Sequence, residues 1–433
     1  MGKLNHLSAR TAARKLALRE ITAQALLEAC LERIAEREPD VHAWTVVAKE
    51  AAMQRARALD AGAHTGLLHG LPIGVKDTFD TVDLPTSYGS PIYAGHRPAS
   101  DAASVALARA AGAVVVGKTV TTEFATYHPG PTRNPHNLEH TPGGSSSGSA
   151  AAVADWMVPL AFGSQTAGSI VRPSAFCGVV GYKPTFGTVN RVGVKMISDT
   201  LDTVGVLARS VPDAALFVAG LSERHDLLIE ARRADAPRIG MCRTHEWTRA
   251  QPETIEMFED IESRLRAAGA TLHDVALPAD FARMVPAQTT IMAHEVASSL
   301  AYERLFQRGL LSPEITAIID AGVAVTPAQY DEARSTGHLC RAMLPQVFIG
   351  CDVLIAPSAI GEAPLGIGAT GDSLFNRMWT LLHTPCVHVP VSRGPLGLPL
   401  GVTVVGRIGA DAAMLSAATW IHEHLVGTEH ADG

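Results

Sequence analysis

The sequence lacks a long apolar run. No apolar stretch approaches the roughly 18 to 20 residues that a membrane-spanning helix needs, and the best candidate is interrupted by Asp155. The first residues, MGKLNHLSAR, contain no apolar core of the secretory kind. We therefore expect a globular, cytoplasmic protein that has no membrane as a partner.

Cysteine is scarce, and a basic cluster is missing. The six cysteines contain no C-x-x-C pair, so their spacing suggests neither a disulfide framework nor a zinc site, and we expect no metal. They are Cys30, Cys177, Cys242, Cys340, Cys351 and Cys386. A formal net charge of −7 without clustered Lys and Arg argues against a nucleic-acid partner, because phosphate binding needs such clusters.

The first sixty residues show helical periodicity. Apolar residues predict helices over about 9–20, 22–37 and 41–59, and Thr22 is placed to cap the second of these. A chain of 433 residues is long enough to bury a large core, in one big domain or in several ordinary ones.

After Gly66 the pattern changes to short apolar strands separated by glycine, proline and helices. The predicted strands are LPIGV at 71, AVVVG at 113, MVPLAFG at 157, CGVVGY at 177, VGVLA at 204, RIGM at 238, DVLIAP at 352, CVHVPV at 386 and GVTVVG at 401. Their alternation with helices, such as 252–268, predicts an α/β fold with a largely buried sheet covered on both faces. The charged stretch 222–237 is the best internal boundary, but strands resume after it. We therefore predict one large domain with an inserted helical region over about 283–349.

Two short glycine motifs suggest other functions. Residues 112–119, GAVVVGKT, satisfy the Walker A expression, but three adjacent valines favour a core strand over a phosphate loop, so we expect Lys118 to be dispensable for turnover. Residues 144–148, GSSSG, satisfy the nucleophile-elbow expression with Ser146, although the polar segment before them does not resemble a strand. A nucleotide-binding protein, a Ser-His-Asp hydrolase and a flexible linker at GGSSSGS (143–149) remain open alternatives.

Four longer segments occur in the order typical of one enzyme family. They are GLLHGLPIGVKDTFD (66–80), TPGGSSSGSAAAVA (141–154), GSQTAGSIVRPSAFCGVVGYKPTFG (163–187) and GLPLGVTVVG (397–406). With these segments the chain resembles the amidase signature family over nearly its whole length. The resemblance implies an amide hydrolase or amidotransferase with a large mixed β-sheet covered by helices. It also implies a single domain over 1–433, in which 1–60 forms amino-terminal helices, 66–220 the signature core and 238–433 the rest of the sheet.

The resemblance also implies a Ser-cisSer-Lys triad without a cofactor. Position by position, it assigns Lys76, Ser145 and Ser169, with Ser169 as the nucleophile and a cis peptide before Ser145. A serine that attacks an amide must lose its proton and later return one to the leaving amine. Lysine accepts that proton only when neutral, and burial lowers its pKa by disfavouring the ammonium form. Ser145 would then pass the proton between Lys76 and Ser169, with Ser146 as a supporting residue.

The loop before the nucleophile is assigned to the oxyanion hole. The resemblance gives this role to the backbone amides of Thr166, Ala167, Gly168 and Ser169. Here the sequence departs from the family pattern, because relatives have glycine where this chain has Ala167 and aspartate where it has Gln165. An alanine would be strained at position 167 only if the loop required a positive φ there.

The substrate assignment depends on one arginine. Arg172 follows the nucleophile by three residues, which looks most like the malonamidase branch, where the corresponding arginine holds a substrate carboxylate. This predicts a small carboxylate-bearing amide such as malonamate, with Ser164 and Gly144 also lining the pocket. A structural salt bridge for Arg172 is the alternative. A hydrolase of carboxybiuret or allophanate type also stays open.

The resemblance leaves the assembly open. The main expectation is a homodimer acting on a small-molecule amide, in part because the amino-terminal helices are amphipathic. The alternative is an amidotransferase A-type subunit that supplies ammonia to a partner chain. We further expect the helices around 283–349, which lie outside the shared motifs, to shape the substrate pocket.

Overall fold

The computed structural model describes residues 3–229, 233 and 235–426, and its centre is one mixed sheet. The sheet has eleven strands in the order β1-β3-β2-β4-β6-β5-β10-β11-β9-β7-β8. The strands are β1 (Trp44–Val47), β2 (Pro72–Lys76), β3 (Val114–Thr119), β4 (Leu160–Gln165), β5 (Val180–Lys183), β6 (Thr203–Ala208), β7 (Arg238–Met241), β8 (Thr271–Asp274), β9 (Val353–Pro357), β10 (Cys386–Arg393) and β11 (Pro399–Val405). Strands β3, β2 and β4 run parallel, as do β9, β7 and β8, and antiparallel strands join the two groups. The predicted α/β class with a large mixed sheet is confirmed.

All nine apolar segments predicted as strands contribute a strand to this sheet. Their side chains are almost entirely buried in β2, β3, β6, β9 and β11, as expected for strands covered on both faces. The prediction of one helix over 41–59 is wrong in its first part. There Trp44–Val47 pairs with β3 as an edge strand, and the helix begins only at Lys49.

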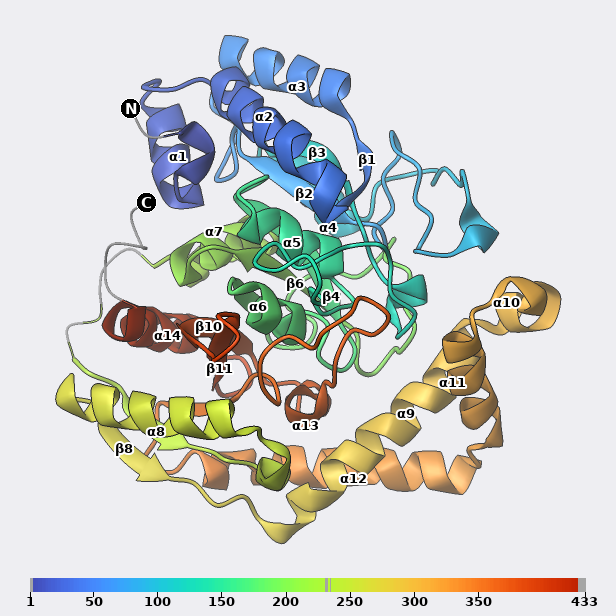
Figure 1. The fold of residues 1–433 in the computed structure, drawn as a ribbon, viewed down its shortest axis with the longest axis vertical. Coiled ribbons are helices and arrows are strands. Elements are labelled where there is room, and N and C mark those ends of the chain that lie inside the picture. The colour runs from blue at the N-terminus through green and yellow to red at the C-terminus, as the bar shows by residue number, and fades with distance from the viewer. Residues whose placement is uncertain (1–2, 230–232, 234, 427–433) are drawn as a thin grey trace.

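Helices surround the sheet, as Figure 1 shows. They are α1 (Ala9–Ala17), α2 (Ala23–Val41), α3 (Lys49–Ala61), α4 (Ala103–Ala110), α5 (Ser147–Ala154), α6 (Val171–Cys177), α7 (Val211–Ser222), α8 (Pro252–Ala267), α9 (Met284–Ser299), α10 (Ala301–Phe306), α11 (Pro313–Ala324), α12 (Pro327–Val347), α13 (Leu374–Leu381) and α14 (Asp411–Val426). Helices α5 and α6 contact each other, and α7 contacts α4 and α14. Strand β10 is contacted by both α6 and α14.

The first two amino-terminal helices form as predicted, and their apolar faces pack on their own chain. The Thr22 side chain caps α2 by accepting a hydrogen bond from the Ala25 N–H at 3.1 Å. The apolar faces of α1 and α2 are buried in the main hydrophobic core of their own chain. The homodimer predicted in part from these faces therefore loses that support.

The charged stretch 222–237 does not divide the chain into two sheets. Residues 230–232 and 234 lie outside the described residues. Strand β6 precedes the stretch, β7 follows it, and both belong to the same eleven-stranded sheet. One sheet therefore runs through the chain, as the single-domain prediction requires.

The inserted helical region is present, with α9 to α12 spanning Met284–Val347. We call these four helices the helical arm; in Figure 1 the arm lies at the lower right, far from α1 to α3. Helix α9 contacts α11, α12 and α13. Thr380 of α13 donates a hydrogen bond to the Ala167 carbonyl in the segment Thr166–Ser169, which we call the nucleophile loop. Because α9 contacts α13, the arm reaches the region of the predicted site.

Candidate active site

Lys76 is the last residue of β2 and is completely buried. Its Nζ donates hydrogen bonds of 2.8 Å to the hydroxyls of Ser145 and Ser164. Burial lowers the pKa of Lys76 to about 7, while the Asp202 carboxylate acts in the opposite direction. A large fraction of this amine is therefore neutral near pH 7, which is the state that a proton acceptor needs.

Ser145 and Ser146 lie in the loop that leads into α5. The peptide between Gly144 and Ser145 is cis. The Ser146 N–H donates to the Ser169 carbonyl at 3.3 Å, so the loop that contains Ser145 and Ser146 lies beside the nucleophile loop. The Ser146 hydroxyl accepts from the Ser164 N–H at 3.4 Å, a contact that suits the supporting role predicted for it.

The structure joins two of the three predicted catalytic groups directly. Lys76 and Ser145 are in hydrogen-bond contact, and Ser169 reaches the same loop through its carbonyl. Within the described residues, no hydrogen bond forms between the Ser169 hydroxyl and Ser145. That last step of the proton path stays a prediction.

The nucleophile loop, Thr166–Ser169, lies between β4 and α6, and its backbone N–H groups are the predicted oxyanion hole. In the described part of the chain, none of its four N–H groups donates a hydrogen bond to a protein acceptor. Such a row of buried, unpaired N–H groups suits a negatively charged oxygen. Ala167 is not among the described residues with positive φ, so alanine is accommodated there without strain.

Gln165, the residue that departs from the family pattern, organises the start of α6. Its Oε1 accepts hydrogen bonds from the N–H groups of Ile170 and Val171, at 2.9 and 3.1 Å. The carboxylate of Asp202 accepts a short hydrogen bond from the hydroxyl of Thr166. Sequence reasoning missed Asp202, because an isolated acid 33 residues after Ser169 carries no motif.

Arg172 is completely buried in α6, and main-chain carbonyls bind its guanidinium. Its Nε and one terminal nitrogen donate to the Gly144 carbonyl at 3.1 and 2.7 Å, and the other terminal nitrogen donates to the Gly371 carbonyl at 2.7 Å. Two of its five N–H groups remain for a ligand. The predicted structural salt bridge is wrong, since Arg172 has no ion-pair partner in the described residues.

Ser164 contacts the predicted base. Its hydroxyl is engaged by the Lys76 amine, and its carbonyl lies 3.4 Å from the same amine. Gly144 contributes its carbonyl to Arg172. Contact of Ser164 or Gly144 with a substrate therefore stays a prediction.

The Walker A-like segment does not form a phosphate loop. Lys118 lies in β3, completely buried, 3.1 Å from the Asp77 carboxylate, so it cannot reach a bound phosphate. Among the described residues, no group of three or more His, Cys, Asp or Glu is arranged to hold a metal ion. No helix in the described ranges is long and apolar enough to cross a membrane.

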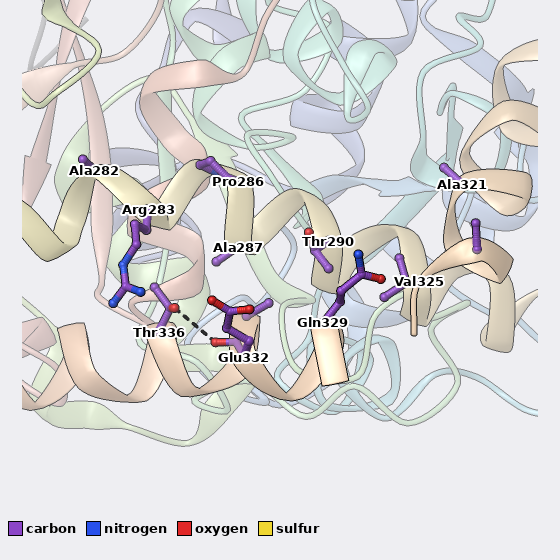
Figure 2. A pocket seen from close by; sticks show the side chains of 12 residues that line it. Ala282, Arg283, Pro286, Ala287, Thr290, Ala321, Val325, Gln329, Glu332 and Thr336 are labelled. Atoms are coloured by element: carbon purple, nitrogen blue, oxygen red, sulfur yellow. Dashed lines mark hydrogen bonds between the residues drawn. The ribbon is translucent and has the colours of Figure 1, made fainter. Parts of the chain in front are cut away.

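The helical arm contains a groove of about 510 Å³ between α9, α11 and α12. Figure 2 shows its lining, in which Ala287 and Thr290 of α9 point toward Glu332 and Gln329 of α12. Gln288, on the same helix, instead contacts the Thr166 carbonyl of the nucleophile loop. The arm thus touches the predicted site through one face of α9 and forms the groove with another.

Comparisons with known proteins identify the family of the chain. Residues 25–415 match the model of the Amidase family. The A subunit of glutamyl-tRNA(Gln) amidotransferase from Anaeromyxobacter sp. (strain K) is 35% identical, over 98% of this chain and 97% of that protein. This relative fits the predicted alternative, an amidotransferase A-type subunit, better than the malonamidase-like branch that the position of Arg172 suggested.

Solved structures have the same fold. A crystal structure of an amidase matches with a TM-score of 0.88 and 30% identity, over 97% of this chain and 100% of that one. An inhibitor-bound chain, from a vestigial complex that reveals the origins of an s-triazine catabolic enzyme, matches with a TM-score of 0.87 and 27% identity, over 96% and 98% of the two chains. The chain therefore belongs to the Amidase family and is an enzyme that hydrolyses amide C–N bonds.

Proposed function

We propose that the protein cleaves a carboxylate-bearing amide through an acyl-enzyme on Ser169. The Ser169 oxygen attacks the amide carbon while its proton passes to Ser145, and the Ser145 proton passes to the neutral amine of Lys76. When the C–N bond breaks, the same path returns a proton to the leaving nitrogen. Water then hydrolyses the ester and regenerates Ser169. The observation that carries this proposal is the buried Lys76 amine, held 2.8 Å from the Ser145 hydroxyl.

The four unpaired N–H groups of Thr166–Ser169 stabilise the negative oxygen of the tetrahedral intermediate. In a buried site such donors are worth more than in water, because no solvent competes for the oxygen. The loop therefore supplies the electrostatic part of catalysis, and the lysine with its two serines supplies the proton transfer.

Two arginines support a substrate with a carboxylate. Neither Arg172 nor Arg377 forms an ion pair in the described part of the chain, and Arg377 is half-buried on α13. Burial lowers the pKa of Arg172 to about 10, and the charge of Arg377 acts in the same direction. The Asp372 carboxylate acts on the pKa of Arg172 in the opposite direction, but among the described residues its ion pair is with Arg249. Two neighbouring cations that form no ion pair favour an anionic ligand.

The acid amide has two candidate forms. The curated relative is the A subunit of an amidotransferase, which favours an enzyme that takes ammonia from glutamine for use by a partner chain. The s-triazine relative favours a small acid amide or urea derivative, since hydrolysis of an N–C–N ring yields such compounds. Both forms contain a carboxylate in addition to the scissile amide and require the same nucleophile.

Ammonia release from glutamine, malonamate, a carboxylated urea and an uncharged monoamide distinguishes these forms. We expect the acid amides to be preferred, Ser169→Ala to abolish release and Arg377→Met to remove the preference for acids. Mass measurement, with glutaminase assays of the chain alone and with candidate partner chains, tests the amidotransferase form. Full activity of Ser169→Ala would exclude the mechanism, and an unchanged acid preference in both Arg377→Met and Arg172→Lys would exclude the carboxylate assignment.

A further inference from the structure

The carbonyl groups of the nucleophile loop are all held by hydrogen bonds. The Gly168 carbonyl accepts from the Arg172 N–H at 2.8 Å, and the Ser169 carbonyl accepts from the Ser146 N–H at 3.3 Å. The two carbonyls before them, of Thr166 and Ala167, are bound by side chains from distant parts of the chain. In a planar trans peptide the C=O and the following N–H point in opposite directions. A partner that fixes a carbonyl therefore also fixes the direction of the next N–H.

Gln288 fixes the first of these peptides. It is completely buried on α9, and its Nε2 donates to the Thr166 carbonyl at 3.0 Å. Its Oε1 accepts from the Arg377 guanidinium at 2.6 Å, which determines that the amide nitrogen faces the loop. The Ala167 N–H is thereby directed to the side opposite Gln288.

Thr380 fixes the second peptide from α13. Its hydroxyl donates to the Ala167 carbonyl at 2.7 Å and accepts from the Gln165 Nε2 at 2.9 Å. The hydroxyl proton has two acceptors, the Ala167 carbonyl at 2.7 Å and the Asn376 carbonyl one turn earlier in α13 at 3.2 Å, and the shorter distance favours the Ala167 carbonyl. The Gly168 N–H is thereby directed to the side opposite Thr380.

We propose that Gln288 and Thr380 are positioning residues that aim the Ala167 and Gly168 N–H groups at the oxyanion of the tetrahedral intermediate. The inference rests on the proposed function, in which these N–H groups form the oxyanion hole. Neither side chain needs to touch the substrate. Each acts by holding a carbonyl whose release would let the next peptide rotate.

Gln288 also connects two parts of the site. The same amide that holds the Thr166 carbonyl accepts a hydrogen bond from Arg377, one of the two arginines assigned to the substrate carboxylate. A second terminal nitrogen of Arg377 donates to the Tyr127 hydroxyl at 2.6 Å, which fixes the guanidinium from the other side. The helical arm therefore contributes to oxyanion-hole geometry through a helix that also lines the groove of Figure 2.

The test compares paired variants at the two positions. Thr380→Val removes the hydroxyl and keeps the shape, whereas Thr380→Ser keeps the hydroxyl and serves as the rescue. Gln288→Glu keeps the acceptor for Arg377 but presents a carboxylate, which cannot donate to the Thr166 carbonyl. Thr290→Val, two residues away on the groove face of α9, is the control with no contact to the loop.

Two rates are measured for each folded variant: kcat and KM for amide hydrolysis, and the rate at which an alkyl fluorophosphonate modifies Ser169. In that modification the Ser169 oxygen bonds to phosphorus, fluoride leaves, and the serine proton passes to Lys76. We expect kcat and the modification rate to fall about 10- to 100-fold in Thr380→Val and Gln288→Glu, because the hole acts on the transition state. KM should stay nearly unchanged in Thr380→Val, whereas in Gln288→Glu the new carboxylate pairs with Arg377 and also raises KM for acid amides, so the modification rate with the uncharged reagent is the deciding readout there. Thr380→Ser and Thr290→Val should retain both rates within about twofold of wild type.

A purely structural role predicts another pattern, in which the melting temperature falls while kcat per folded molecule and the modification rate stay at wild-type values. That pattern, or equal losses in Thr380→Ser and Thr380→Val, would overturn the inference. If Thr380→Val does not fold, Gln288→Glu decides the question alone. Failure of the proposed function has a separate signature, since the wild-type protein would then neither release ammonia nor be modified at Ser169.

Discussion

Lys76 is expected to determine the acidic limb of the pH profile of kcat/KM. Its pKa is lowered from 10.5 to about 7, and only the neutral amine can accept the serine proton. The neutral fraction is about one half at pH 7, about a tenth at pH 6 and about a hundredth at pH 5. We therefore expect kcat/KM to be level above about pH 8 and to fall about tenfold per pH unit below about pH 6.

Asp202 provides a perturbation of this limb with a defined sign. Its carboxylate raises the pKa of Lys76, against the effect of burial, so the isosteric change Asp202→Asn should move the midpoint to lower pH. The asparagine oxygen can still accept from the N–H groups of Ile197 and Ser198, now held at 2.8 and 3.0 Å. Its NH2 group can donate to the Thr166 hydroxyl, so the loop keeps its contacts.

Initial rates between pH 5 and 10, at substrate concentrations well below KM, give this midpoint for each protein. The control is Asp199→Asn, which makes the same change of charge at an exposed residue of the same loop. Its profile should match that of the wild type. A wild-type rate that kept rising tenfold per unit to pH 10 would show a lysine of ordinary pKa, and a midpoint raised by Asp202→Asn would contradict the assigned electrostatics.

Two further changes test the packing that holds the site in place. Lys118→Met leaves the Asp77 carboxylate buried without its cation and should lower the free energy of unfolding by about 3 to 5 kcal/mol; the double variant with Asp77→Asn should recover most of the loss in urea titrations. Gly148→Ala places a methyl group 2.2 Å from the Ala43 carbonyl oxygen and 2.4 Å from the Val120 nitrogen, both backbone atoms. That overlap should destabilise the protein by at least about 1 to 3 kcal/mol, and a variant that melted at the wild-type temperature would show that α5 can move away from β3 freely.

The sequence predicts the central strands well because their burial is visible in composition. A strand covered on both faces is an almost continuous apolar run, and all nine such runs form strands. The two edge strands were missed. In β8, only Leu272 of Thr271–Asp274 is buried, and β1 has only four residues before a helix. Such segments are strands because a neighbour pairs with them, which no local pattern reveals.

The same distinction applies to the site. Lys76, Ser145 and Ser169 occur in glycine-rich motifs, so their resemblance to a known family locates them. Gln288 and Thr380 act on the nucleophile loop from 122 and 213 residues away in the sequence. Each is a single polar residue in a helix whose neighbours carry no motif. Their importance follows only from the fold, which brings α9 and α13 against the same loop.

The acid that follows Lys76 in the sequence shows how the fold keeps the base neutral. A carboxylate facing the amine would favour the ammonium form, but Asp77 instead lies 3.1 Å from Lys118 and accepts from the Ser87 N–H and hydroxyl. Lys118 in turn donates to the Phe79 carbonyl at 2.7 Å, so both charges of the pair are satisfied away from Lys76. Lys118 thus pairs with the acid that follows the base in the sequence and keeps it away from the Lys76 amine. That Lys118 is dispensable for turnover stays a prediction, and its structural contribution is the one that the Lys118→Met variant measures.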